Sequence, residues 1–233
     1  PPRSTLFPYT TLFRSSYSPD IDAENYARAF FDNYIISHGR GDMAEYLKKL
    51  IKNENILTIL NNSKDGNSAK ASLTNLFTNN DENKSLQDIA LKFESEWLNL
   101  GYQIIFTLEN LFKISCPFEA VHIDLTTLRL CPYDYRKKRI FVYANTDIQS
   151  QMRIILHELN HFFFYSLYHN LPLKKHNHEM YELLKESLTL FSNPEQTGKP
   201  NEKQLREYFI KNNIDSIEKA VDLGSIYLDS TTT

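Results

Sequence analysis

The chain has 233 residues, of which 41% are hydrophobic and 13% aromatic, and this composition is sufficient for a globular protein with a sizeable core. Its formal net charge of −3 at pH 7 leaves no large basic surface, which excludes the usual electrostatic basis of nucleic-acid binding. No run of about 18 apolar residues is present, so the sequence predicts no membrane span.

The two cysteines, Cys116 and Cys131, each precede a proline and lie on either side of a strand-like run. The ends of an extended strand lie too far apart for a disulfide, so we expect both side chains to be thiols. Thiols are typical of a reducing compartment, and we therefore predict a cytoplasmic protein.

Residues 1–15 differ in character from the rest of the chain. They repeat Thr-Leu-Phe at positions 5–7 and 11–13, and they show neither helical nor strand periodicity. We expect a non-native addition and leave it out of the predicted fold. In that case the native N-terminus, with any export signal, is missing.

Residues 16–113 show helical periodicity and no motif with recognisable chemistry. Aromatic residues such as Tyr26, Phe30 and Trp97 recur at helical spacing, which predicts core packing and not a ligand site. Stretches rich in Gly and Asn separate the periodic segments. The predicted helices span residues 21–38, 43–52, 69–77 and 85–100, the pattern resumes after Gly101 up to residue 112, and residues 55–60 are short and apolar.

From residue 117 the period changes to that of β-strands. Residues 120–125 alternate in polarity, and residues 139–144 are β-branched and aromatic. Residues 131–135 are a predicted turn, and the basic cluster at 136–139 is expected in a hairpin turn between strands. The sequence therefore predicts an α+β fold that is mostly helical, with a small antiparallel or mixed sheet.

A helix is predicted directly after the second strand. Thr146-Asp147-Ile148-Gln149 matches a capping box in which Thr146 caps the helix. Apolar residues then recur at helical spacing, namely Ile148, Met152, Ile155, Leu156, Leu159 and Phe163.

This helix contains His157-Glu158-Leu159-Asn160-His161, which is an H-E-x-x-H motif. Positions i and i+4 share one face of a helix, about 5–6 Å apart at Cβ, so both imidazoles can reach one zinc ion. Glu158 lies beside such a metal without being forced onto it. That position suits a general base that takes a proton from zinc-bound water, so the motif predicts a catalytic zinc centre.

A catalytic zinc needs a third protein ligand and a fourth position for water. The next predicted helix, residues 178–191, offers Glu186 between Leu183 and Leu190. A carboxylate in apolar surroundings is costly to bury unless a cation pairs with it, and zinc is such a cation. We therefore expect Glu186 to be the third ligand. The other candidates for that ligand are Glu182, His176 and His178.

The motif, followed by a glutamate on the next helix, resembles the gluzincins, zinc metallopeptidases of the H-E-x-x-H class. The resemblance covers about residues 119–191. It implies a zincin-like core in which His157, His161 and Glu186 bind zinc and Glu158 is the general base. It also implies that the sheet lies beside the active-site helix and that its edge takes up a peptide as an added strand.

We therefore predict a zinc-dependent metallopeptidase that hydrolyses peptide bonds. The predicted organisation is an N-terminal helical region at 16–113 and a catalytic region at 114–233, which ends in helices at 201–212 and 215–228. Two alternatives remain: the same ligands hold zinc in a non-catalytic regulatory protein, or the motif is coincidental in a metal-free interaction module. Three residues are candidates for the oxyanion donor that hydrolysis requires: Tyr165, Tyr181 and Tyr227.

Overall fold

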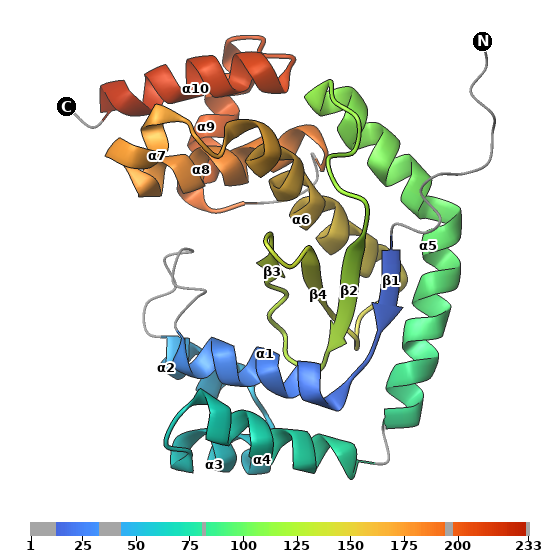
Figure 1. Ribbon diagram of the computed structural model, residues 1–233. Helices are drawn as coiled ribbons and strands as arrows, with labels where there is room; N and C mark the ends of the chain where they lie inside the picture. The colour runs from blue at the N-terminus through green and yellow to red at the C-terminus, as the bar shows by residue number, and fades with distance from the viewer. Residues whose placement is uncertain (1–12, 33–42, 81–82, 194–197, 232–233) are drawn as a thin grey trace. The chain divides into compact units, whose positions relative to one another are not determined.

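The computed structural model describes residues 13–32, 43–80, 83–193 and 198–231. These residues form mostly helices and one small sheet, which confirms the predicted α+β class (Figure 1).

The chain forms two compact units, each built from two separate stretches. The first unit combines Pro1–Leu100 with Ala120–Gln151, and the second combines Gly101–Glu119 with Met152–Thr233. The boundary predicted from the sequence, at residue 113, instead divides the chain at one point into two continuous regions.

The first unit contains a mixed four-stranded sheet in the order β1-β2-β4-β3 (Figure 1). Strands β1 and β4 both run parallel to β2, whereas β3 runs antiparallel to β4. Residues 136–138 of the basic cluster lie in the turn between β3 and β4, as predicted, whereas Arg139 is the first residue of β4. The strands span Phe13–Ser16 (β1), Val121–Thr126 (β2), Tyr133–Asp134 (β3) and Arg139–Tyr143 (β4).

Strand β1 corrects the expectation that residues 1–15 lack strand structure, because residues 13–15 pair with β2. Phe13 is buried, and its ring centroid lies 3.9 Å from that of Trp97. Oγ of Ser15 donates a hydrogen bond to the carbonyl oxygen of Ala90 at 2.9 Å. A strand of four residues is too short for its alternation to be recognised in the sequence. Residues 1–12 lie outside the described residues.

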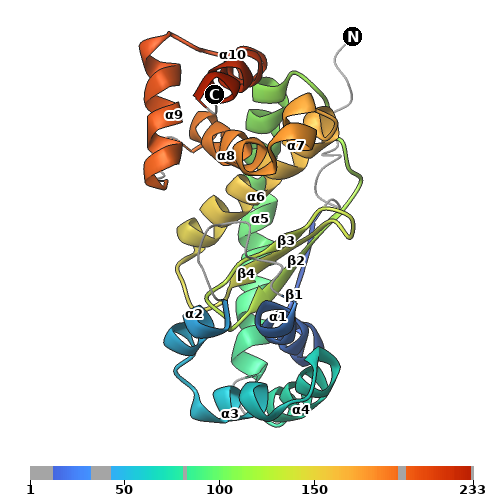
Figure 2. The same cartoon turned by 90° about the vertical axis from the view of Figure 1, so that its left-hand side faces the viewer.

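Helices surround a hydrophobic core in the first unit, where α1 packs along α4 (Figures 1 and 2). Tyr26 and Phe77 are buried in this core, which confirms that the aromatic residues of this region serve packing. The side chain of Asn53 caps α3, so the short apolar run forms a helix. The helices span Pro19–Phe31 (α1), Met43–Leu50 (α2), Glu54–Asn62 (α3), Gly66–Thr78 (α4) and Asn83–Phe112 (α5, which continues through Gly101 into the second unit). The end predicted for the first helix, residue 38, lies outside the described residues.

Asp22 of α1 is a buried carboxyl that links this helix to the end of β2. It accepts hydrogen bonds from Oγ1 of Thr126 at 2.6 Å and from Oγ1 of Thr127 at 2.7 Å. Burial raises the pKa of Asp22 to about 6, although the hydrogen bonds from Thr126 and Thr127 act to lower it.

Helix α6, Ile148–Tyr168, carries the H-E-x-x-H motif, and its cap differs from the predicted one. Oδ1 of Asp147 accepts a hydrogen bond from the backbone N–H of Ser150 at 2.9 Å, and Oδ2 accepts one from its Oγ at 2.6 Å. The helix begins one residue later than a Thr146 cap requires, so Asp147 is the capping residue and the Thr146 prediction is wrong.

The second unit is helical, and its central helix α8 packs against α7, α9 and α10 (Figure 2). Its aromatic core includes Phe112 and Phe163, whose ring centroids lie 5.5 Å apart. Helix α7 precedes α8, and Pro172 starts it at a favourable first position. The remaining elements span Pro172–His176 (α7), His178–Leu188 (α8), Thr189–Phe191 (a short 3-10 turn), Pro200–Lys211 (α9) and Ile217–Thr231 (α10).

Within the described residues, no helix has both the length and the apolar character that crossing a bilayer requires.

Candidate metal centre

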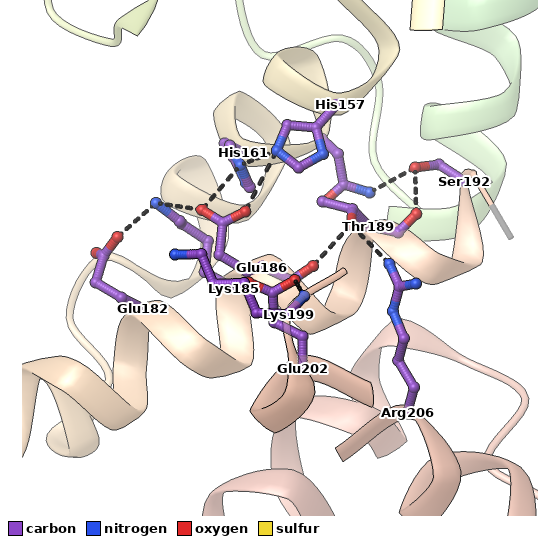
Figure 3. A network of polar contacts seen from close by, with 11 residues as sticks. His157, His161, Glu182, Lys185, Glu186, Thr189, Ser192, Lys199, Glu202 and Arg206 are labelled. Carbon is purple, nitrogen blue, oxygen red and sulfur yellow. Dashed lines mark hydrogen bonds and ion pairs between the residues drawn. The ribbon is translucent and has the colours of Figure 1, made fainter. Parts of the chain in front are cut away.

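Helix α6 presents both motif histidines on one face, and α8 brings a glutamate to them (Figure 3). Nε2 of His157 lies 2.9 Å from Nε2 of His161. Nε2 of His157 lies 3.3 Å from Oε2 of Glu186, and Nε2 of His161 lies 3.3 Å from Oε1 of the same carboxylate. The structure thus brings together the three side chains that the sequence predicts as zinc ligands.

The separations of these atoms fit a zinc ion. Ligand atoms of a tetrahedral zinc at 2.0–2.1 Å lie about 3.3 Å from one another. Each imidazole nitrogen lies at this distance from one oxygen of Glu186, Oε2 for His157 and Oε1 for His161. The 2.9 Å between the two imidazole nitrogens is shorter and corresponds to an angle of about 90° at such a metal. Three ligands from His157, His161 and Glu186 leave a fourth position for water.

Glu158 is buried beside the histidines, and ligand atoms of His157, Glu158 and His161 all lie within 4.8 Å of one another. Oε2 of Glu158 has no hydrogen-bond partner among the described residues. Burial raises the pKa of Glu158 to about 7; the charge of His157 opposes this shift and that of Glu186 adds to it. A buried carboxyl that titrates near neutrality suits a group that accepts and returns a proton.

The protonation of the ligand set also suits a metal. Burial lowers the pKa of His161 to about 3, so its imidazole is neutral at pH 7, which is the form that binds metals. Burial acts to raise the pKa of Glu186, but neighbouring His161, His157 and Lys185 hold it well below its ordinary value. Glu186 is therefore an ionised carboxylate that faces the neutral imidazole of His161.

The alternative third ligands lie elsewhere. Glu182 is on the far side of Lys185 from the histidines in Figure 3, with its Oε2 2.6 Å from Nζ of Lys185. His178 is exposed, and its ring stacks 6.3 Å from that of Tyr181. The side chain of His176 lies outside the described residues. Of the candidates whose side chains are described, only Glu186 contacts both motif histidines.

Lys185 belongs to the candidate centre and was not predicted from the sequence. Its Nζ lies 3.4 Å from Oε1 of Glu186 and also contacts Glu182. One feature of the sequence could have indicated that Lys185 is buried. It lies between apolar Leu184 and Glu186, on the buried side of an amphipathic helix.

A second group of polar residues, also not predicted, fixes the backbone at the end of α8 (Figure 3). Nδ2 of Asn160, inside the motif, donates to Oγ of Ser192 at 3.0 Å, and that hydroxyl donates to the carbonyl of Thr189 at 3.1 Å. Oγ1 of Thr189 donates to the carbonyl of Glu186 at 2.7 Å, and Nη2 of Arg206 donates to the same hydroxyl at 3.4 Å. These bonds tie the ligand on α8 to the motif helix.

The three tyrosines considered as oxyanion donors have other described contacts. Tyr165 donates to Oε1 of Glu182 at 3.3 Å, and the ring of Tyr227 stacks 4.3 Å from that of Tyr208. Tyr181 is buried, and its hydroxyl has no hydrogen-bond partner among the described residues. An oxyanion role for any of them stays a prediction.

The first unit contains a cavity of about 860 Å³ beside Tyr26, Phe77 and Arg129. The residues that line it include no histidine, cysteine, aspartate or glutamate, so it offers neither metal ligands of these types nor a carboxylate base. The candidate metal ligands His157, His161 and Glu186 all belong to the second unit.

In comparisons with known proteins, no protein-family model, curated protein or solved structure matches the chain.

Proposed function

We propose that this protein is a zinc-dependent metallopeptidase with a zincin-like core, in which His157, His161 and Glu186 hold the metal. The observation that carries the proposal is the set of distances among their donor atoms: 2.9, 3.3 and 3.3 Å. The two 3.3 Å distances end on different oxygens of Glu186, Oε2 for His157 and Oε1 for His161, and each equals the separation of about 3.3 Å between two ligand atoms of a tetrahedral zinc.

When bound, zinc supplies a polarised water and a Lewis acid for the scissile carbonyl. Glu158 accepts the proton that the attacking water loses and then returns it to the leaving amine. Its burial supports this role, because a carboxyl with a pKa of about 7 takes up and releases protons near neutral pH. Asn160 and the residues that hold the end of α8 keep Glu186 directed at the histidines.

The test combines zinc content, measured by elemental analysis, with cleavage of a quenched-fluorescent peptide library. We expect about one zinc per chain and cleavage of library peptides that a chelator abolishes. Glu158→Gln should keep its zinc and lose at least about 100-fold in hydrolysis, the range of a lost general base. Glu179→Gln, which removes an exposed carboxylate from α8, is the matched control and should leave both values unchanged.

A second candidate is a non-catalytic zinc protein that uses the same ligands to hold α6 and α8 together. Burial favours it, because His161 is only 1% exposed and Glu158 is also buried, whereas a catalytic metal must admit substrate. Zinc without hydrolysis in the parent protein supports this candidate. No zinc in the parent after zinc is supplied contradicts both.

A further inference from the structure

Lys185 is 1% exposed although it carries a charge. A buried ammonium is costly unless carboxylates compensate it, so its partners indicate its role. Nζ lies 2.6 Å from Oε2 of Glu182 and 3.4 Å from Oε1 of Glu186 (Figure 3). Lys185 therefore bridges the carboxylate that faces the two histidines and a second carboxylate that does not.

The second carboxylate is itself held in place. Glu182 is 8% exposed, and its other oxygen accepts a hydrogen bond from Oη of Tyr165 at 3.3 Å. Nζ of Lys185 lies 5.4 Å from the centre of the same tyrosine ring, within the range of a cation–π contact. Tyr165 and Glu182 together fix the ammonium of a long and otherwise flexible side chain.

The formal charges around the centre indicate that it binds a cation. Glu158, Glu182 and Glu186, when ionised, and Lys185 leave a formal charge of −2 on this group of side chains, of which Glu186 is partly buried and the others are buried. A divalent cation neutralises that charge. Without such a cation, the ammonium of Lys185 forms an ion pair with Glu186.

We propose that Lys185 is a positioning residue that compensates Glu186 when zinc is not bound and keeps its carboxylate directed at His157 and His161. The inference rests on the proposed function, because it takes these three side chains as the zinc ligands. Once zinc is bound, the metal supplies most of the positive charge that Glu186 needs. The protein then depends on Lys185 much more in the metal-free state than in the zinc-bound state.

The simpler explanation is that Lys185 stabilises α8 alone, since Glu182 and Lys185 form an (i, i+3) ion pair. The two explanations differ in how stability responds to zinc. If Lys185 acts in helix formation or packing, its replacement lowers stability by the same amount with and without zinc. If it acts through its charge, its replacement lowers stability much more without zinc than with it.

The experiment compares Lys185→Met and Lys185→Arg with the parent by thermal unfolding, once in a chelator and once with zinc. In chelator, Lys185→Met should lower Tm by about 10 °C, because buried Glu182 and partly buried Glu186 lose their shared cation. With zinc the loss should shrink to less than half. Lys185→Arg should keep most of the parent's Tm in both conditions.

Lys174→Met is the matched control. Nζ of Lys174 lies 5.7 Å and 5.3 Å from the ring centres of Tyr165 and Tyr181, but within the described residues it pairs with no carboxylate. Its loss should lower Tm by a small amount that zinc does not change. Where the parent binds zinc, an equal loss for Lys185→Met with and without zinc overturns the inference, and in every case no loss in chelator overturns it.

A second variant covers the case in which Lys185→Met does not fold. Adding Glu182→Gln removes one of the two uncompensated carboxylates, so the double variant should regain folding or several degrees of Tm in chelator. No gain overturns the charge role. If the parent takes up no zinc, the proposed function fails, and the comparison in chelator still decides whether Lys185 acts through its charge.

Discussion

Nδ2 of Asn160 donates a hydrogen bond to Oγ of Ser192 at 3.0 Å, and this bond joins the middle of the motif helix to the turn that follows α8. Asn160 directly precedes His161, and Ser192 lies six residues after Glu186. The bond therefore couples two helices that must keep a fixed register for His161 and Glu186 to share a metal.

Asn160→Ala should weaken the centre without removing a ligand. We expect a loss of about 1–3 kcal/mol in the free energy of unfolding, because a buried hydrogen bond disappears, and about a 10-fold weaker affinity for zinc. Urea denaturation and competition with a chromophoric chelator measure the two quantities. Ser192→Ala should give a similar loss and the double variant little more; fully additive losses would show that the two side chains act independently.

Glu186→Gln tests the third ligand directly. An amide oxygen lacks the charge that a zinc site requires, so zinc content after dialysis should fall from about one per chain to a small fraction. Glu182→Gln is the control, since its carboxylate contacts Lys185 and Tyr165. The assignment is reversed if Glu182→Gln loses the metal and Glu186→Gln retains it.

Because of Asp22, the free energy of unfolding of the first unit should fall as pH rises through mildly acidic values. Its pKa is 3.8 in the unfolded chain and about 6 in the folded protein, where burial raises it. Below 3.8 both states bind the proton, and between 3.8 and about 6 only the folded state does, so stability falls with rising pH by up to about 3 kcal/mol.

Asp22→Asn removes this titration. Urea denaturation at intervals from pH 4 to pH 7 measures the free energy of unfolding of both proteins. The value for the parent should fall relative to that for the variant as pH rises. Parallel pH profiles of the two proteins would contradict the buried state of this carboxyl.

Phe13→Ala tests whether residues 13–16 belong to the fold. The ring is buried and lies 3.9 Å from Trp97, so its removal should cost about 3–5 kcal/mol of stability. Because the chain has a single tryptophan, its fluorescence should also move to longer wavelength. Phe106→Ala removes an exposed ring and should change neither value much. An unchanged spectrum and stability for Phe13→Ala would argue that this strand is dispensable.

The motif residues were predictable because their chemistry depends on local spacing. His157 and His161 share a face by helical geometry alone. Glu186 could be chosen over Glu182 because its apolar neighbours made an uncompensated carboxylate costly there. The ligand roles themselves stay predictions until zinc is measured.

The features that escaped prediction depend on contacts between residues distant in sequence or on a single-residue boundary. Strand β1 forms through pairing with β2, more than 100 residues away, and so has no local signature. Asp147 and Thr146 are both good caps, and only the start of α6 decides between them. Lys185 in an amphipathic helix is normally solvated. Its carboxylate partners, Glu182 and Glu186, belong to the same helix, and its burial depends on residues distant in sequence such as Tyr165 of α6, whose ring centre lies 5.4 Å from Nζ.

The two discontinuous units have a practical consequence for anyone who wishes to study the zinc chemistry alone. The chain passes from one unit to the other at 100/101, 119/120 and 151/152, and two of these passages lie inside the continuous helices α5 and α6. No single truncation from either end, and no single proteolytic cut, therefore isolates a unit. A minimal version of the second unit has to join residues 101–119 to 152–233 by a designed linker.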